Sequence, residues 1–203
     1  MKVIIEPSFV ITVFVFLLSG DMEYVFLMLF SALIHECGHL LTLRLYKVRV
    51  KALVLGLFGG TIVLQKKLIS YKGDFFVAIS GSLANLIFSV MLFFLLRYRF
   101  STPLFFFFLS NVTYALFNLL PVSNLDGGMA LRSLLLIKKE PYEAERIVGL
   151  VSRISLFLLA FGGLWLVGIC AFNISLLVIV ILLYAESTGG HIISGYEFCR
   201  KTS

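Results

Sequence analysis

The chain has 203 residues, of which 60% are hydrophobic and only 14% are charged. Soluble domains are about 45–50% apolar and about 25% charged, and a mean hydropathy of +1.04 exceeds what one core of this size could bury. These values exclude a soluble globular enzyme and a disordered chain. The three scattered cysteines exclude a disulfide scaffold. The composition predicts a multi-pass integral membrane protein.

Apolar runs separated by charge predict an α-helical polytopic fold with about six transmembrane helices. The first run, at about residues 8–18, is short for a crossing that needs ~20 residues, unless residues 3–5 extend it; its positive start leaves a signal peptide as the alternative. The other spans are expected at about residues 24–46, 75–96, 103–120, 147–171 and 174–185. We expect a single integral-membrane domain over residues 1–203, with a core at about 24–137, a C-terminal helical hairpin at about 147–186 and no separate soluble domain.

The segment between the second and third spans has a strand-like pattern. Residues 49–55 and 61–64 are rich in β-branched and aliphatic residues, and Gly56, Gly59 and Gly60 lie between them. This pattern predicts two short strands joined by a glycine turn. The segment is too short for two crossings, so we expect a membrane-dipping β-hairpin whose backbone is covered by protein or lines a wet cavity.

The positive charges predict how the chain is oriented. Lysine and arginine mark cytoplasmic loops, whereas acidic residues contribute little. A layout with both termini in the cytoplasm places every basic residue on the cytoplasmic side except Arg97 and Arg99. The net charge of +6 therefore indicates topology, and we expect no nucleic-acid partner.

The second span contains the sequence His35-Glu36-Cys37-Gly38-His39. Two histidines four residues apart share one face of a helix, so both imidazoles can reach one ion. Glu36 follows the first histidine, where it can take a proton from a metal-activated water, as in the H-E-x-x-H metalloproteases. The alternative is a polar cluster that joins helices, or a pair of histidines in a transport path.

A catalytic zinc site needs a third protein ligand. Of the acidic residues, only Glu36 and Asp126 lie away from span ends and charged loops. Asp126 follows Pro121 and precedes Gly127 and Gly128, which would end one helix and permit a tight turn. It could serve as a helix N-cap, but beside the histidine pair it is the best-placed oxygen ligand. His191, the remaining histidine, is expected at the surface.

These residues resemble the site-2 protease family of intramembrane zinc metalloproteases, in a small sporulation-type branch. The resemblance rests on residues 35–39, on Asn118-Leu119-Leu120-Pro121 and on Leu125-Asp126-Gly127-Gly128. It implies one Zn²⁺ per chain bound by His35, His39 and Asp126, with Glu36 as the catalytic base. It also implies that residues around 57–60 form the membrane-dipping hairpin, whose exposed strand edge would hold an extended substrate. Either strand could supply that edge.

The resemblance extends to a third motif with one departure. Gly81-Ser82-Leu83-Ala84-Asn85 is similar to the family's Gly-Pro-x-x-Asn, with Ser82 in the place of the proline. Asn85 and Asn118 would then bind the substrate backbone or the developing oxyanion, while interhelical hydrogen bonding is the structural alternative.

The expected activity is hydrolysis of a peptide bond in or near the transmembrane segment of a membrane-bound substrate, in a cell membrane of bacterial type. Expected partners are a membrane-protein substrate and a membrane-embedded regulator; the oligomeric state is left open. The competing hypothesis is a metal transporter that uses the same His/Asp cluster as a transit site, although transporters usually spread ligands along a path. A catalytically inactive scaffold would leave the intact motif unexplained.

Overall fold

The computed structural model describes residues 2–7, 10, 14, 21–56, 59–64, 69–169 and 180–184. The predicted first span, and the sixth span with its helical hairpin, fall largely outside these residues. His191 lies entirely outside them.

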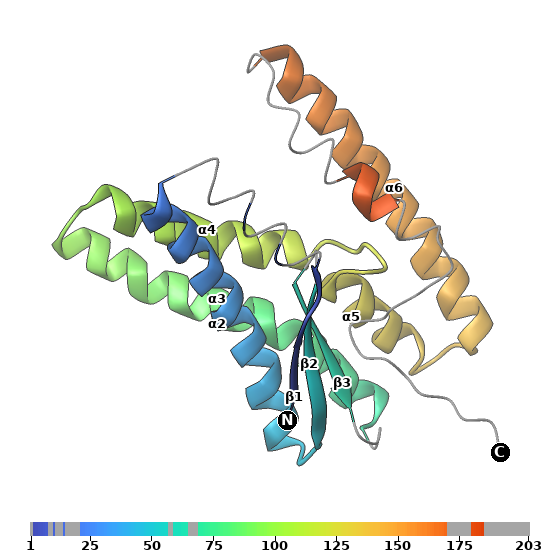
Figure 1. Ribbon diagram of the computed structural model, residues 1–203. Coiled ribbons are helices and arrows are strands. Elements are labelled where there is room, and N and C mark those ends of the chain that lie inside the picture. Colours follow the sequence, from blue (N-terminus) through green and yellow to red (C-terminus); the bar gives the residue numbers. More distant parts are fainter. Residues whose placement is uncertain are drawn as a thin grey trace.

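Five helices carry most of the described chain (Figure 1). They are α2 (Met22–Leu45), α3 (Tyr71–Tyr98), α4 (Thr102–Asn118), α5 (Asp126–Leu135) and α6 (Pro141–Ile169). Among the described helices, α2, α3 and α6 are long and apolar enough to cross a membrane, whereas α4 has 17 residues. The protein is therefore mostly helical and integral to a membrane, and the count of six spans remains a prediction.

Serine caps explain why two helices begin before their predicted apolar runs. The Ser70 side chain accepts a hydrogen bond from the backbone of Gly73, and the Ser101 side chain accepts one from Leu104. Each bond satisfies an N–H that has no partner within the helix, so α3 and α4 start at polar residues outside the hydrophobic pattern.

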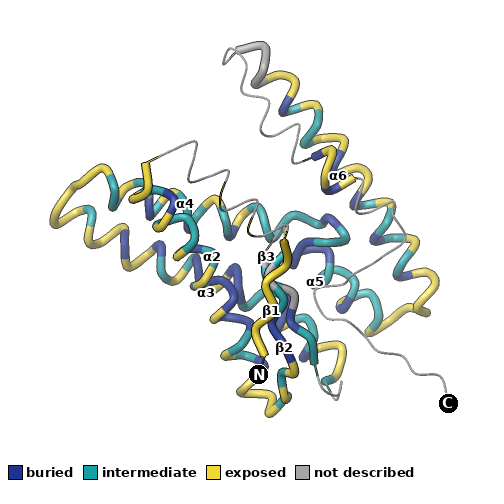
Figure 2. Tube along the Cα trace, in the orientation of Figure 1, coloured by how far each residue is buried: buried dark blue, intermediate teal, exposed yellow. Residues whose placement is uncertain are grey.

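The helices bury polar residues and expose apolar ones. On α2, Phe26, Leu33 and Leu41 are exposed, whereas Ser31 and His35 are buried. Figure 2 shows this alternation of exposed and buried positions along the helices. The pattern suits a helix in lipid, where no hydrophobic force drives helices together and small or polar residues make the contacts between them.

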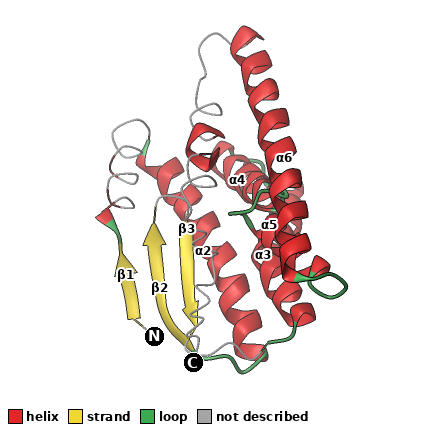
Figure 3. Cartoon of the chain, turned by 90° about the vertical axis from the view of Figure 1, so that its right-hand side faces the viewer, coloured by secondary structure: helices red, strands yellow, loops and turns green. Residues whose placement is uncertain are grey.

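A three-stranded sheet lies against one side of the helices (Figure 3). Its central strand β2 (Val50–Gly56) pairs antiparallel with β3 (Gly59–Leu64) and parallel with β1 (Lys2–Ile5). Residues 3–5 therefore form a strand and do not lengthen the first span, because their backbone groups pair with β2. That the hairpin dips into a membrane remains a prediction.

The sheet is joined to the helices by a small apolar cluster. Leu43 of α2, Val77 of α3, Leu53 of β2 and Ile62 of β3 are buried together. This packing brings the hairpin against α3 and against α2, the helix that carries the histidine motif. A strand therefore lies beside the candidate site.

Candidate metal centre

The buried face of α2 carries the three polar residues of the histidine motif. His35, Glu36 and His39 are 3%, 8% and 4% exposed. The spacing of four residues puts the two imidazoles on one face, with ring centroids 4.7 Å apart. Burying three ionisable groups in an apolar helix costs free energy unless they pair with other groups, and such residues usually mark a functional site.

Asp126 joins this pair from the start of α5. Its Oδ2 lies 2.9 Å from His35 Nε2 and 3.2 Å from His39 Nε2, and the two Nε2 atoms are 3.1 Å apart. The N-cap of α5 is Leu125, with no side-chain capping bond. The N-cap alternative for Asp126 is therefore wrong, because its carboxylate is directed to the histidines.

The backbone of α3 approaches the histidines closely at Gly81. A Cβ there would lie 2.7 Å from His35 Nε2 and closer still to His39 Nε2, so only glycine fits. One turn earlier, the Val77 carbonyl oxygen lies 2.8 Å from His39 Nδ1. That contact favours a proton on Nδ1 and leaves Nε2 with its lone pair towards Asp126.

The three groups fit a tetrahedral divalent cation. Their ligand atoms lie within 4.8 Å of one another, and all three residues are buried. Bonds of about 2.0–2.2 Å to a tetrahedral zinc ion require ligand atoms roughly 3.3–3.6 Å apart, slightly wider than the separations here. Two imidazoles and a carboxylate are also the donors that zinc prefers in catalytic sites.

Glu36 lies beside this cluster and outside it. Its Oε1 accepts a hydrogen bond of 3.2 Å from the backbone N–H of Gly60 in β3, whereas its Oε2 has no hydrogen-bond partner among the described residues. The carboxylate is not among the three groups that could hold a metal, and its Oε2 is able to accept a proton.

The two predicted asparagines occupy different environments. Asn85 is fully buried on α3 and donates to the Ser31 carbonyl oxygen of α2 over 3.1 Å, while its own Oδ1 has no hydrogen-bond partner in the described ranges. Asn118 is partly buried and donates to the Tyr114 carbonyl oxygen within α4. The Asn85 bond is the interhelical contact foreseen as its alternative role, and substrate contact remains a prediction for both residues.

Two neighbours of the site were not foreseen from the sequence. The sequence places Gly60 in the predicted hairpin turn, and the hydrogen bond from its backbone amide involves no side chain that a sequence pattern could indicate. The Tyr114 ring stands edge-on to His35, with centroids 5.1 Å apart. Its position one turn before Asn118 on α4 is the only signal in the sequence that could have indicated it.

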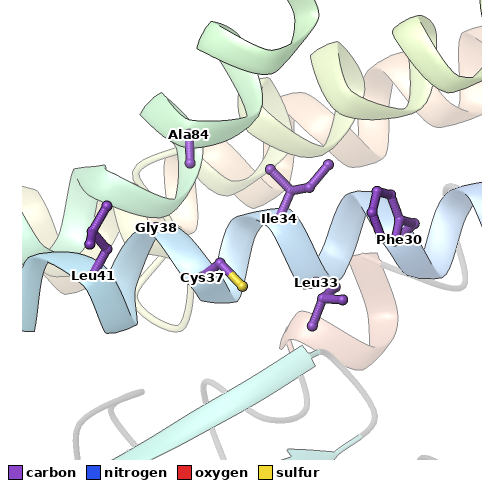
Figure 4. Close-up of a pocket in the computed structure, with 7 residues that line it drawn as sticks. All are labelled: Phe30, Leu33, Ile34, Cys37, Gly38, Leu41 and Ala84. Atoms are coloured by element: carbon purple, nitrogen blue, oxygen red, sulfur yellow. The ribbon is translucent and has the colours of Figure 1, made fainter.

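An apolar pocket of about 280 Å³ lies on another face of α2. Figure 4 shows its lining residues Phe30, Leu33, Ile34, Cys37, Gly38, Leu41 and Ala84. Cys37 is a free, exposed thiol in this lining. Because the lining offers almost no polar surface, the pocket is unsuited to a metal, and the chemistry belongs to the buried face.

The sequence of this chain is similar to those of known proteins. The model of peptidase family M50 matches residues 23–102 and 96–162. A zinc metalloprotease of Methanocaldococcus jannaschii is 28% identical over 166 residues, which cover 78% of this chain and 47% of that protein. Stage IV sporulation protein FB of Bacillus subtilis is 29% identical over 188 residues, which cover 90% of this chain and 64% of that protein. This chain thus spans less than two thirds of the length of either relative.

The fold has a counterpart among solved structures. The site-2 protease from Methanocaldococcus jannaschii matches with a TM-score of 0.68 at 20% sequence identity, over 91% of this chain and 88% of that one. The likeness extends across nearly all of both chains.

Proposed function

Because the chain belongs to peptidase family M50, the family of the site-2 proteases, we propose that it is an intramembrane zinc metalloprotease. It would hydrolyse a peptide bond in or near the transmembrane segment of a membrane-bound substrate. The observation that carries this proposal is the convergence of His35, His39 and Asp126 in apolar surroundings, with the carboxylate of Glu36 beside them.

His35, His39 and Asp126 would hold one Zn²⁺ through Nε2, Nε2 and Oδ2. A zinc ion held there would lower the pKa of a water molecule and polarise the scissile carbonyl. The residues around it keep the ligands in place: the Val77 carbonyl oxygen orients His39, and the Tyr114 ring packs on His35. Such support behind the ligands tunes metal affinity.

Glu36 would act as the general base. Its unpartnered Oε2 can take the proton of the attacking water and later deliver it to the leaving amine. Asn85 and Asn118 are proposed to contact the substrate backbone or the developing oxyanion. The free Oδ1 of Asn85 supports contact with a substrate N–H.

The substrate would bind in an extended form along β3. In the described sheet, β2 lies between β1 and β3, so the two edge strands are β1 and β3. Of these, β3 is the strand that contacts Glu36, through the N–H of Gly60. An added strand there would donate and accept main-chain hydrogen bonds. A transmembrane helix would have to unwind locally to pair in this way.

The proposed substrate is therefore a membrane protein, with a membrane-embedded regulator as a further proposed partner. A transporter is less well supported than a protease. Transport needs polar groups spread along a path, whereas the ligands found in the described residues converge on one point.

The test replaces Glu36 by glutamine in the full chain. We expect Glu36→Gln to keep a wild-type zinc content and to lose cleavage of a reporter fused to a single-span membrane segment, by about 100-fold or more, as for removal of a general base. Zinc is measured by atomic emission, and cleavage by gel mobility.

Glu23→Gln is the matched control, because Glu23 is exposed in the first turn of the same helix. Full cleavage by Glu36→Gln would rule out the mechanism. Zinc flux into vesicles without cleavage by the wild type would favour the transporter.

A further inference from the structure

The two oxygens of the Glu36 carboxylate are in different situations. Oε1 accepts a hydrogen bond from the main-chain N–H of Gly60 at 3.2 Å, and Oε2 is buried without a partner in the part of the chain that the structure describes. A carboxylate with neither oxygen held could rotate about its last bond, because that torsion is soft. The Gly60 contact therefore selects which oxygen remains available.

The contact depends on the absence of a side chain at position 60. A Cβ there would lie 2.6 Å from Glu36 Cδ and 2.7 and 2.9 Å from the two carboxylate oxygens. All three separations are shorter than ordinary carbon contacts of about 3.5 Å. Only glycine allows the strand backbone to come close enough for its amide to reach Oε1.

Gly60 also belongs to the strand proposed to receive the substrate. It lies opposite Leu55 of β2 in an antiparallel ladder, yet its N–H is donated to Glu36. Because alternate N–H groups of an edge strand point away from the partner strand, the N–H of Ile62 is at the same outer edge as that of Gly60. One strand edge thus offers pairing to a substrate and a hydrogen bond to the base.

We propose that the main-chain amide of Gly60 positions Glu36 for catalysis, by holding Oε1 so that Oε2 faces the water to be deprotonated. This inference rests on the proposed protease function and adds a positioning residue to it. It also couples the base to the hairpin, so a shift of β3 on substrate pairing would move the base with it.

The kinetic test is Gly60→Ala. The added methyl group must displace the Glu36 carboxylate, which is the flexible end of a side chain, so folding and zinc content should be unchanged. We expect kcat to fall about 10- to 100-fold with KM within about twofold, because a displaced base affects the transition state and not ground-state binding. Cleavage of the membrane-segment reporter gives both constants.

Gly56→Ala is the matched control in the same hairpin. Among the described residues, a Cβ there would meet only the carboxylate of Glu6, at 3.0 Å. We expect wild-type kcat for this variant. A raised KM with unchanged kcat in Gly60→Ala would overturn the proposal, because it would make Gly60 a substrate contact only.

A second measurement needs no activity and distinguishes failure of this inference from failure of the protease assignment. Hydrogen exchange of the Gly60 amide, followed by magnetic resonance of the full chain labelled at glycine and valine in micelles, should accelerate at least about tenfold in Glu36→Ala. It should remain slow in Glu36→Gln, whose side-chain oxygen still accepts. The Val63 amide on the same strand is the reference for opening of the hairpin. Equal exchange at Gly60 in all three proteins would overturn the proposal even if the wild type cleaves.

Discussion

Asp126 shows how tertiary contacts change the role of a single side chain. In the sequence it precedes an apolar helix and has the local features of an N-cap. In the structure it is the first residue of α5, and its Oδ2 lies about equally close to His35 and His39. Local propensity favoured a cap worth about 1 kcal/mol, but a buried carboxylate gains more from partners that offset its desolvation.

For this single residue, we predict that Asp126→Asn weakens zinc binding. The amide oxygen of asparagine carries no charge, so the affinity for zinc should fall. Loss of a residue that only supports the ligands lowers metal affinity about 10- to 100-fold, and loss of a ligand should lower it further. Competition with a chelator measures the affinity. Asp74→Asn, at the first turn of α3 and outside the cluster, should bind zinc as the wild type does. Equal affinities of Asp126→Asn and the wild type would contradict the ligand assignment.

The helices α2 and α3 pack closely against each other at the site. At Gly38 of α2 an added Cβ would lie 2.5 Å from the Ser80 carbonyl oxygen and 2.8 Å from Ala84 Cβ on α3. Gly81 of α3 provides the reciprocal space next to the histidine rings. Small residues at such crossings let helix backbones pack closely in a membrane, and here the packing brings the Val77 carbonyl oxygen to His39.

We expect Gly38→Ala to destabilise the protein by about 1–3 kcal/mol, the usual cost of overpacking. The methyl group would meet α3 backbone, which cannot move aside as a side-chain end can. Thermal unfolding in detergent, with zinc content, measures the effect. Gly149→Ala on α6 is the control, because an added Cβ there meets no atom of the described residues within 4 Å. A Tm for Gly38→Ala at or above that of Gly149→Ala would contradict this packing role.

Over the whole molecule, the distribution of basic residues predicts a definite orientation. The segments after α2 and after α5 should be cytoplasmic, and the connection between α3 and α4 should lie on the other side. Lys47, Lys138 and Arg99 are exposed residues in these three places.

We predict this orientation for single-cysteine variants in which Cys37, Cys170 and Cys199 are replaced by serine. A membrane-impermeant maleimide should label Arg99→Cys in intact cells, and Lys47→Cys and Lys138→Cys only after permeabilisation. Labelling of Lys47→Cys in intact cells would reverse the topology and contradict the positive-inside argument.

Several features of the fold could be predicted because they depend on local patterns. Apolar runs located α2, α3 and α4 to within about four residues, with serine caps accounting for the early starts of α3 and α4. The helix α6 begins at Pro141, before the predicted start at about residue 147, because its first turns are polar. The strand β1 could not be foreseen. Residues 3–5 read as an extension of an apolar run, and only pairing with β2, far along the chain, makes them a strand.

By itself the sequence determined the membrane character and the residues of the candidate site. Charge is so costly in apolar spans that the few buried polar groups stand out, and the spacing of four residues depends only on helix geometry. Only the tertiary structure decided that Asp126 meets both histidines, that β3 and not β2 is the edge beside Glu36, and that the Gly60 amide holds its carboxylate. These contacts join residues from 24 to 91 positions apart. The Gly60 contact also involves a backbone amide, which every residue except proline has, so no residue type in the sequence indicates it.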